Sequence, residues 1–113
     1  MQREIKFRVF DKEAKTMHKV SSIDFENKEV FIYDKNGFDK NLSFDEIELM
    51  QFTGLTDKNG GEVYEGDVLN CEDWKEPSAV KWIKEECNFN IVEFGIHKVE
   101  IIGNIYKTPE LLK

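Results

Sequence analysis

The stretch that decides the fold covers residues 50–68 and reads MQFTGLTDKNGGEVYEGDV. Near its centre, Asn59-Gly60 accepts positive φ at little cost, so this pair favours a tight hairpin turn between two strands. The residues up to Thr53 are expected to be extended, and Gly54 is expected to break that strand. We interpret the tetrapeptide that begins at Asp57 as the turn itself.

The same stretch ends in a second turn signal. Gly66 can take a backbone conformation that is closed to residues with a Cβ. Asp67 can accept backbone N–H bonds in that turn, and Val68 and Leu69 then begin a buried strand. This Gly-Asp-Val arrangement is common where the strands of small SH3-like barrels begin.

Outside this stretch, the tetrapeptide Asp-Lys-Asn-Gly of residues 57–60 also occurs at residues 34–37. The flanking sequences differ, which indicates repeated turn chemistry rather than a duplicated domain. Ile5, Phe7 and Val9 alternate with charged residues, a pattern that predicts a strand with one face in water. Other strands are predicted at Thr16–Val20, Ser22–Glu26, Lys28–Tyr33, Ala79–Ile83, Phe89–Phe94 and Val99–Tyr106.

Helical signals are short. Ser43 to Glu46 has the spacing of a capping box and predicts one helical turn, although the alternation from Ile47 onward favours a strand equally. Thr108-Pro109 predicts another short turn near the C-terminus. We therefore expect one mainly β domain over residues 1–113, either a small SH3-like barrel or packed antiparallel sheets, with an N-terminal β extension and only short helical turns.

Charge and composition limit which cell compartment and which binding partners can be expected. The 113 residues include 23 acidic and 16 basic side chains, for a net charge of −7, which argues against broad binding to a phosphate backbone. Neither a secretory signal nor an apolar run of membrane-spanning length is recognisable, so we expect a cytoplasmic protein that does not enter a membrane. Its two cysteines, Cys71 and Cys87, should then be reduced.

Three blocks of the chain resemble the YopX-like family. They are the opening REIKFRVFD of residues 3–11, residues 50–68, and the closing IGNIY of residues 102–106 with the Pro-Glu-Leu-Leu of residues 109–112. The resemblance implies a protein encoded by bacteriophages and prophages, a mostly β fold and no established biochemical activity. The family often has Trp where Phe10 stands here. The motif positions, which we interpret as structural turn residues, are Gly54, Asp57, Asn59, Gly60, Gly66 and Asp67.

No residue pattern predicts a cofactor, a metal or a catalytic centre. The soft metal ligands Cys71, Cys87, His18 and His97 are all at least ten positions apart, whereas zinc sites use closely spaced pairs. The Asp57 loop fails the calcium pattern, because Gly61 and Glu62 stand at its fifth and sixth positions. A Cys87–His97 dyad and the acid-rich stretch from Glu62 to Glu86 are compatible with chemistry, but no motif sharpens either, so we expect no enzyme.

Trp74 is the one candidate interaction residue. It lies in the polar, loop-like segment of residues 71–77, where a tryptophan either contacts a partner or folds back over the core. The function favoured is a phage or prophage accessory protein that acts through protein–protein contacts, as a homo-oligomer or with a phage or host protein. The alternatives are a small β module associated with nucleic acid, against which the charge weighs, and an acidic DNA mimic that inhibits a host enzyme.

Overall fold

The computed structural model describes residues 4–33, 36–37, 39–90 and 98–109, and strands dominate them. The chain divides into two compact units. We call Lys6–Gln51 the N-terminal unit, and Phe52–Lys113 with Met1–Ile5 the C-terminal unit. The expectation that all 113 residues act as a single domain stays a prediction.

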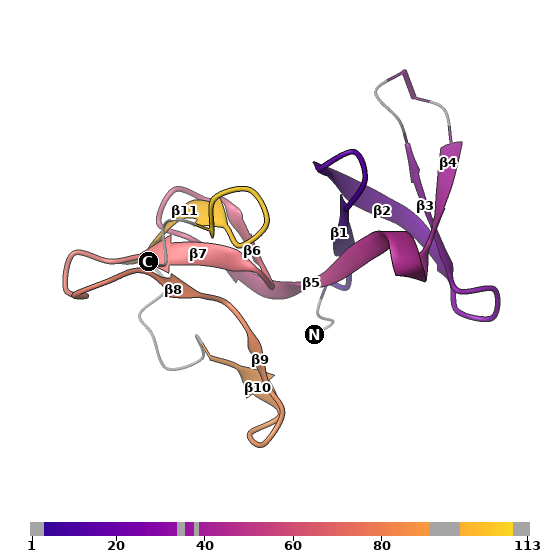
Figure 1. Ribbon diagram of the computed structural model, residues 1–113. Helices are drawn as coiled ribbons and strands as arrows, with labels where there is room; N and C mark the ends of the chain where they lie inside the picture. The colour runs from indigo at the N-terminus through magenta and orange to yellow at the C-terminus, as the bar shows by residue number, and fades with distance from the viewer. Residues whose placement is uncertain (1–3, 34–35, 38, 91–97, 110–113) are drawn as a thin grey trace. The chain divides into compact units, whose positions relative to one another are not determined.

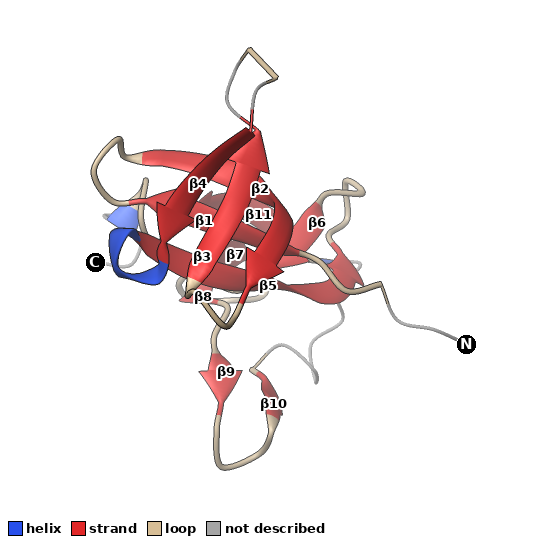
Figure 2. Ribbon diagram, turned by 90° about the vertical axis from the view of Figure 1, so that its right-hand side faces the viewer, coloured by secondary structure: helices blue, strands red, loops and turns tan. Residues whose placement is uncertain are grey.

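The N-terminal unit is an antiparallel sheet in the order β4-β3-β2-β1-β5 (Figures 1 and 2). Its strands are β1 (Phe7–Asp11), β2 (Thr16–Asp24), β3 (Glu29–Tyr33), β4 (Asp39–Ser43) and the first part of β5 (Ile47–Thr56). A 3-10 turn, η1 (Phe44–Glu46), joins β4 to β5. The hairpin between β3 and β4 contains Gly37 at φ 85°, as the Asn-Gly signal predicts.

The core of the N-terminal unit is formed by side chains from every strand of its sheet. The residues buried in it are Val9, Val30, Ile32, Leu42 and Ile47, with Val20, Ile23 and Phe44 packed at the margin. Register explains the grouping, because Val20 pairs with Ile32 and Val30 pairs with Leu42, so each pair shares a face.

Three details of this unit correct the sequence expectations. In β1, Val9 and Phe10 point to opposite faces of the sheet and are both buried, so neither face lies in water at the C-terminal end of this strand. Ile5 lies outside the strand and is 69% exposed. The strands predicted at Thr16–Val20 and Ser22–Glu26 form one strand, β2, because a register irregularity after Val20 lets pairing with β3 continue. The third detail is the turn η1, which forms without a side-chain hydrogen bond from Ser43, and β5 begins directly after it, so both expected structures occur in succession.

The C-terminal unit contains the rest of β5 and six short strands. These are β6 (Glu62–Tyr64), β7 (Asp67–Asn70), β8 (Ser78–Ala79), β9 (Trp82–Ile83), β10 (Asn88–Phe89) and β11 (Glu100–Asn104). β6 pairs with β5, a three-stranded sheet has the order β11-β7-β8, and β9 and β10 form a hairpin. The buried cluster between them consists of Val63, Leu69, Cys71, Val80 and Val99.

These sheets are all antiparallel, and within the described residues they close into no barrel, so packed sheets describe the chain better than an SH3-like barrel. Gly54 does not end its strand as expected. It has φ 91° and lies inside β5, where the register with β6 shifts between Phe52 and Thr56, as at a β-bulge. The strand predicted at Phe89–Phe94 and the C-terminal turn lie partly outside the described residues. No helix in the described part of the chain is long and apolar enough to cross a membrane.

Candidate functional site

The hairpin turn between β5 and β6 is organised by the buried carboxylate of Asp57. Its Oδ1 accepts hydrogen bonds from the backbone N–H groups of Asn59 at 3.0 Å and Gly61 at 2.7 Å, and its Oδ2 accepts one from Ile101 at 3.0 Å. Gly60 has φ 83° and its N–H donates to the Asp57 carbonyl. Burial by itself raises the pKa of Asp57, but the three N–H donors and the charge of Lys58 outweigh it and hold the pKa below its usual value.

A second turn, between β6 and β7, is organised in the same way by Asp67. This side chain is 2% exposed, and its Oδ2 accepts the backbone N–H of Tyr64 at 2.8 Å. Gly66, at φ 89°, donates its N–H to the Val80 carbonyl and accepts the N–H of Ile105. Asp57 and Asp67 therefore each accept backbone N–H groups in a turn, and each turn is hydrogen-bonded to a distant segment of the chain.

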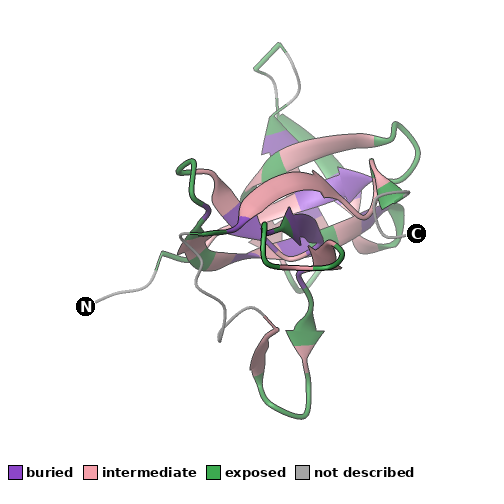
Figure 3. Cartoon of the chain, turned by 90° about the vertical axis from the view of Figure 1, so that its left-hand side faces the viewer, coloured by how far each residue is buried: buried purple, intermediate pink, exposed green. Residues whose placement is uncertain are grey.

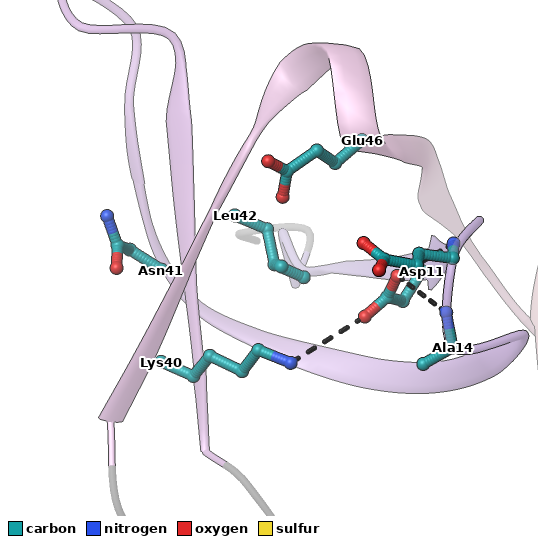
Figure 4. Close-up of a pocket in the computed structure, with 7 residues that line it drawn as sticks. Asp11, Ala14, Lys40, Asn41, Leu42 and Glu46 are labelled. Carbon is teal, nitrogen blue, oxygen red and sulfur yellow. Dashed lines mark hydrogen bonds and ion pairs between the residues drawn. The ribbon is translucent and has the colours of Figure 1, made fainter.

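A third buried aspartate, Asp11, borders an open cleft of about 530 Å³ in the N-terminal unit (Figure 4). Asp11 Oδ1 accepts the backbone N–H groups of Glu13 and Ala14, and Lys40 Nζ lies 3.8 Å from its Oδ2. Lys40 extends from β4 toward Asp11, and the Glu46 carboxylate points from η1 into the same space. The cleft is thus lined by three acidic residues, Asp11, Glu13 and Glu46, and by one basic residue, Lys40.

The chemistry of this cleft is limited by how its acids are arranged. Among the described residues, no three His, Cys, Asp or Glu side chains come close enough together to hold a metal ion. One carboxylate oxygen of Asp11 accepts hydrogen bonds from the β1–β2 turn, and the other oxygen faces Lys40. This is the arrangement of a capped turn with an ion pair. A smaller cleft of about 380 Å³ in the C-terminal unit includes Lys58 and Lys98, and Lys58 is paired with Glu100 at 3.2 Å.

The two cysteines differ in their surroundings. Cys71 is buried in the core of the C-terminal unit, and Cys87 is exposed in the turn of the β9–β10 hairpin; both are free thiols. His18 accepts or donates a hydrogen bond with the Thr16 hydroxyl at 2.7 Å, at the β1–β2 end of the other unit. His97 lies outside the described residues, and so does the Cys87–His97 pair that the sequence analysis considered.

Trp74 lies in the loop between β7 and β8, as predicted, but it is only partly exposed. It packs against the core cluster of the C-terminal unit, and its backbone N–H donates to the Cys71 carbonyl. Of the two arrangements that the sequence allowed, the structure has the ring folded back over the core. A contact between Trp74 and a partner stays a prediction.

The exposed tryptophan of the chain is Trp82, which the sequence analysis did not single out. Its exposed fraction is 48%, and it lies in β9 of the hairpin that extends away from the β11-β7-β8 sheet (Figure 1). In Figure 3 the hairpin is coloured as exposed and intermediate throughout. Trp82 was missed because it lies in an ordinary alternating strand pattern, Ala79–Ile83, in which an aromatic residue suggests core.

Neighbouring contacts hold Trp82 in place. Its ring stands edge to face against that of Phe89, with the centroids 5.2 Å apart, and Phe89 in turn packs against the core. Asn90 fastens the base of the hairpin, because its Oδ1 accepts the N–H of Lys81 at 3.0 Å and its Nδ2 donates to the Ala79 carbonyl at 2.9 Å. The hairpin therefore presents a large aromatic side chain in a fixed position.

Comparison with known proteins identifies relatives but no activity. The sequence model described as YopX protein matches residues 6–113. Among solved structures, the chain is similar to the crystal structure of protein EF1440 from Enterococcus faecalis, with a TM-score of 0.66 and 25% identity. That similarity covers 99% of this chain and 100% of the other. No curated protein matches the sequence.

Proposed function

Because the chain belongs to the YopX family, we propose that it is a phage or prophage accessory protein that acts through protein–protein contacts in the bacterial cytoplasm and does not catalyse a reaction. The observation that supports this proposal best is Trp82, which is half exposed on a hairpin that extends away from the β11-β7-β8 sheet. Tryptophan is the side chain most enriched at the energetic centres of protein interfaces.

The fixed position of Trp82 strengthens the argument. Association costs free energy whenever a flexible side chain must be ordered, and a ring already braced by Phe89 avoids much of that cost. Exposure also leaves apolar area that a partner would remove from water, at roughly 25 cal/mol for each Å². Phe25 is more exposed, at 71%, but it lies at the turn after β2 and meets Phe44 with a longer centroid distance of 6.4 Å.

The proposal is tested by affinity capture from phage-infected cells, with nuclease treatment to remove contacts that nucleic acid mediates. Wild type is compared with Trp82→Ala, and Phe25→Ala serves as the matched control, since it removes an exposed aromatic ring from the other unit. We expect Trp82→Ala alone to lose the captured proteins. Equal capture by all three proteins would contradict the proposal.

Binding to nucleic acid is a second candidate function, favoured by one feature of the N-terminal unit. Arg8 on β1 lies directly opposite Lys19 on β2 in the strand register. Lys19 lies on the same face of the sheet as Tyr33, which is exposed. Cations beside an aromatic ring are the elements of a single-strand binding surface. Fluorescence anisotropy with single-stranded DNA across a salt series separates the two candidates, because submicromolar binding near physiological salt, with a steep salt dependence, would rank this function first.

A further inference from the structure

We propose that the outer edge of β4 binds an extended, basic peptide segment of a partner protein, which adds to the sheet of the N-terminal unit as one more strand. This contact surface goes beyond the proposed function, because it lies in the N-terminal unit, whereas Trp82 lies in the C-terminal unit. Two observations carry the inference, an open sheet edge and the charge of the cleft beside it.

Among the described residues, nothing pairs with the outer edge of β4, the last strand in its sheet (Figure 1). The Phe44 N–H donates to the Lys28 carbonyl, so this pair is a hydrogen-bonded one, and the next residue of β4, Ser43, is turned away from β3. By the same alternation, Asn41 and Asp39 direct their backbone N–H and C=O groups outward. Both residues are exposed, and no described residue bonds to these outward groups.

An open edge of this kind is a template for another strand. The outward N–H and C=O groups of β4 give an extended peptide a row of donors and acceptors. The edge strand β11 of the C-terminal unit shows the contrasting arrangement, because the N–H of Ile101 is bonded to the carboxylate of Asp57. The edge of β4 has no such cover among the described residues, so its main chain can pair with a partner.

The cleft of about 530 Å³ beside this edge selects the chemistry of the peptide. It is bounded by β4 on one side and by the β1–β2 turn and η1 on the other (Figure 4). Lys40 faces Asp11 at 3.8 Å, whereas the exposed carboxylates of Glu13 and Glu46 have no cation partner among the described residues. A strand added to β4 places every second side chain on the face of the cleft, where an arginine or lysine would meet these carboxylates.

Charge argues against an acidic occupant, such as a second copy of this chain. The lysines of the net-positive segment 12–19 do not line the cleft, and Lys12 is paired with Glu48 at 3.8 Å. A second copy would bring a net charge of −7 to a cleft in which three acids accompany one lysine. A basic peptide is instead attracted both by the chain as a whole and by the cleft.

Fluorescence anisotropy of labelled peptides with the full chain tests the added strand. The probe is a short peptide that alternates valine and arginine, compared with two forms that are N-methylated at the valines or at the arginines. Only every second N–H of an added strand faces β4, so one methylated form should lose at least about tenfold in affinity. The other form should bind within about threefold of the unmodified peptide.

Three substitutions in the protein separate the edge, the cleft and net charge. Asn41→Pro removes an outward N–H, a change that an edge strand tolerates. Glu46→Lys changes the charge of the cleft, and Glu26→Lys makes the same change in net charge at the exposed β2–β3 turn of the same unit. We expect the first two each to weaken binding of the unmodified peptide about tenfold, and Glu26→Lys to weaken it by less than about twofold. Thermal midpoints verify that the variants fold.

The outcomes that would overturn the inference are distinct. Equal affinity of the two methylated peptides would exclude an added strand, whether or not Asn41→Pro folds. Equal losses for Glu46→Lys and Glu26→Lys would exclude a role for the cleft, and so would binding of a peptide with glutamate in place of arginine. A lack of saturable binding by the arginine peptide would contradict the whole inference. Dimerisation of wild type that Asn41→Pro abolishes would assign the edge to a second copy instead.

Discussion

The Oδ2 atom of Asp57 accepts a hydrogen bond from the backbone N–H of Ile101, which joins the β5–β6 turn to β11, 44 positions further along the chain. The other oxygen of the same carboxylate holds Asn59 and Gly61 within the turn. Asp57 therefore links three backbone segments of the C-terminal unit.

The substitution Asp57→Asn tests this role. The amide keeps one oxygen for the turn but presents an NH₂ group to the N–H of Ile101, which cannot accept the bond. We expect the free energy of unfolding to fall by about 1.5–3 kcal/mol, the range for losing a hydrogen bond to a charged group. Urea unfolding measures the change. The control is Asp24→Asn, because Asp24 caps an exposed turn through Asn27; a loss in the control as large as in Asp57→Asn would contradict the account.

The same carboxylate predicts a pH dependence. The pKa of Asp57 is raised by burial but lowered further by the N–H groups of Ile101, Gly61 and Asn59, so its folded pKa lies below its unfolded value. Its contribution to stability is therefore full above the unfolded pKa, about 3.9, and is lost as pH falls through the folded pKa. The difference in unfolding free energy between wild type and Asp57→Asn should be constant near neutrality and shrink in acid. A difference that does not change with pH would show that the ionised form has no special role.

Gly66→Val tests the second turn. Gly66 has φ 89°, a region that β-branched residues rarely adopt, and its N–H and carbonyl are both bonded to distant segments, so the backbone cannot relax without losing them. We expect a loss of roughly 1–3 kcal/mol and a lower thermal midpoint. Lys75→Val, at an exposed loop position, is the control and should stay within about 0.5 kcal/mol of wild type. An unchanged midpoint for Gly66→Val would refute the strain argument.

Asn90→Ala tests how the hairpin is fastened. The change removes two side-chain hydrogen bonds, to the N–H of Lys81 and to the carbonyl of Ala79, so the amide of Lys81 should exchange its hydrogen faster. Asn90→Asp keeps the acceptor and loses the donor, and should give an intermediate rate. Hydrogen exchange followed by NMR measures both variants, with the amide of Leu69 in the buried β7 strand as the internal reference. Equal protection of Lys81 in all three proteins would show that Asn90 does not hold the hairpin.

Local sequence chemistry predicted much of this fold. Gly60 and Gly66 have the positive φ that their neighbours indicated, and strand-forming residues lie in strands. The failures come from pairing between segments. Gly54 was expected to end its strand, but pairing with β6 continues β5 through it as a bulge. One face of the first strand was expected to lie in water, but Phe10 on that face is buried.

The candidate site was harder to predict for the same reason. Trp74 and Trp82 both lie next to lysines, and nothing local says which ring faces the core. The loop around Trp74 reads as exposed, but its ring covers the buried cluster. Trp82 reads as a strand residue, and it is exposed because β9 and β10 form a hairpin of their own, away from the sheet. That outcome depends on contacts between distant residues, which local patterns do not encode.

The central claim is that Trp82 is covered when the protein meets its partner. Trp74→Phe leaves Trp82 as the only tryptophan, so its fluorescence can be followed alone. The measurement is acrylamide quenching of that fluorescence, in dilute protein, in concentrated protein and with any protein recovered by capture. The account predicts that the quenching constant falls, and that the emission shifts to shorter wavelength, when association occurs. Quenching that stays the same in all three conditions, while association is demonstrated independently, would contradict it.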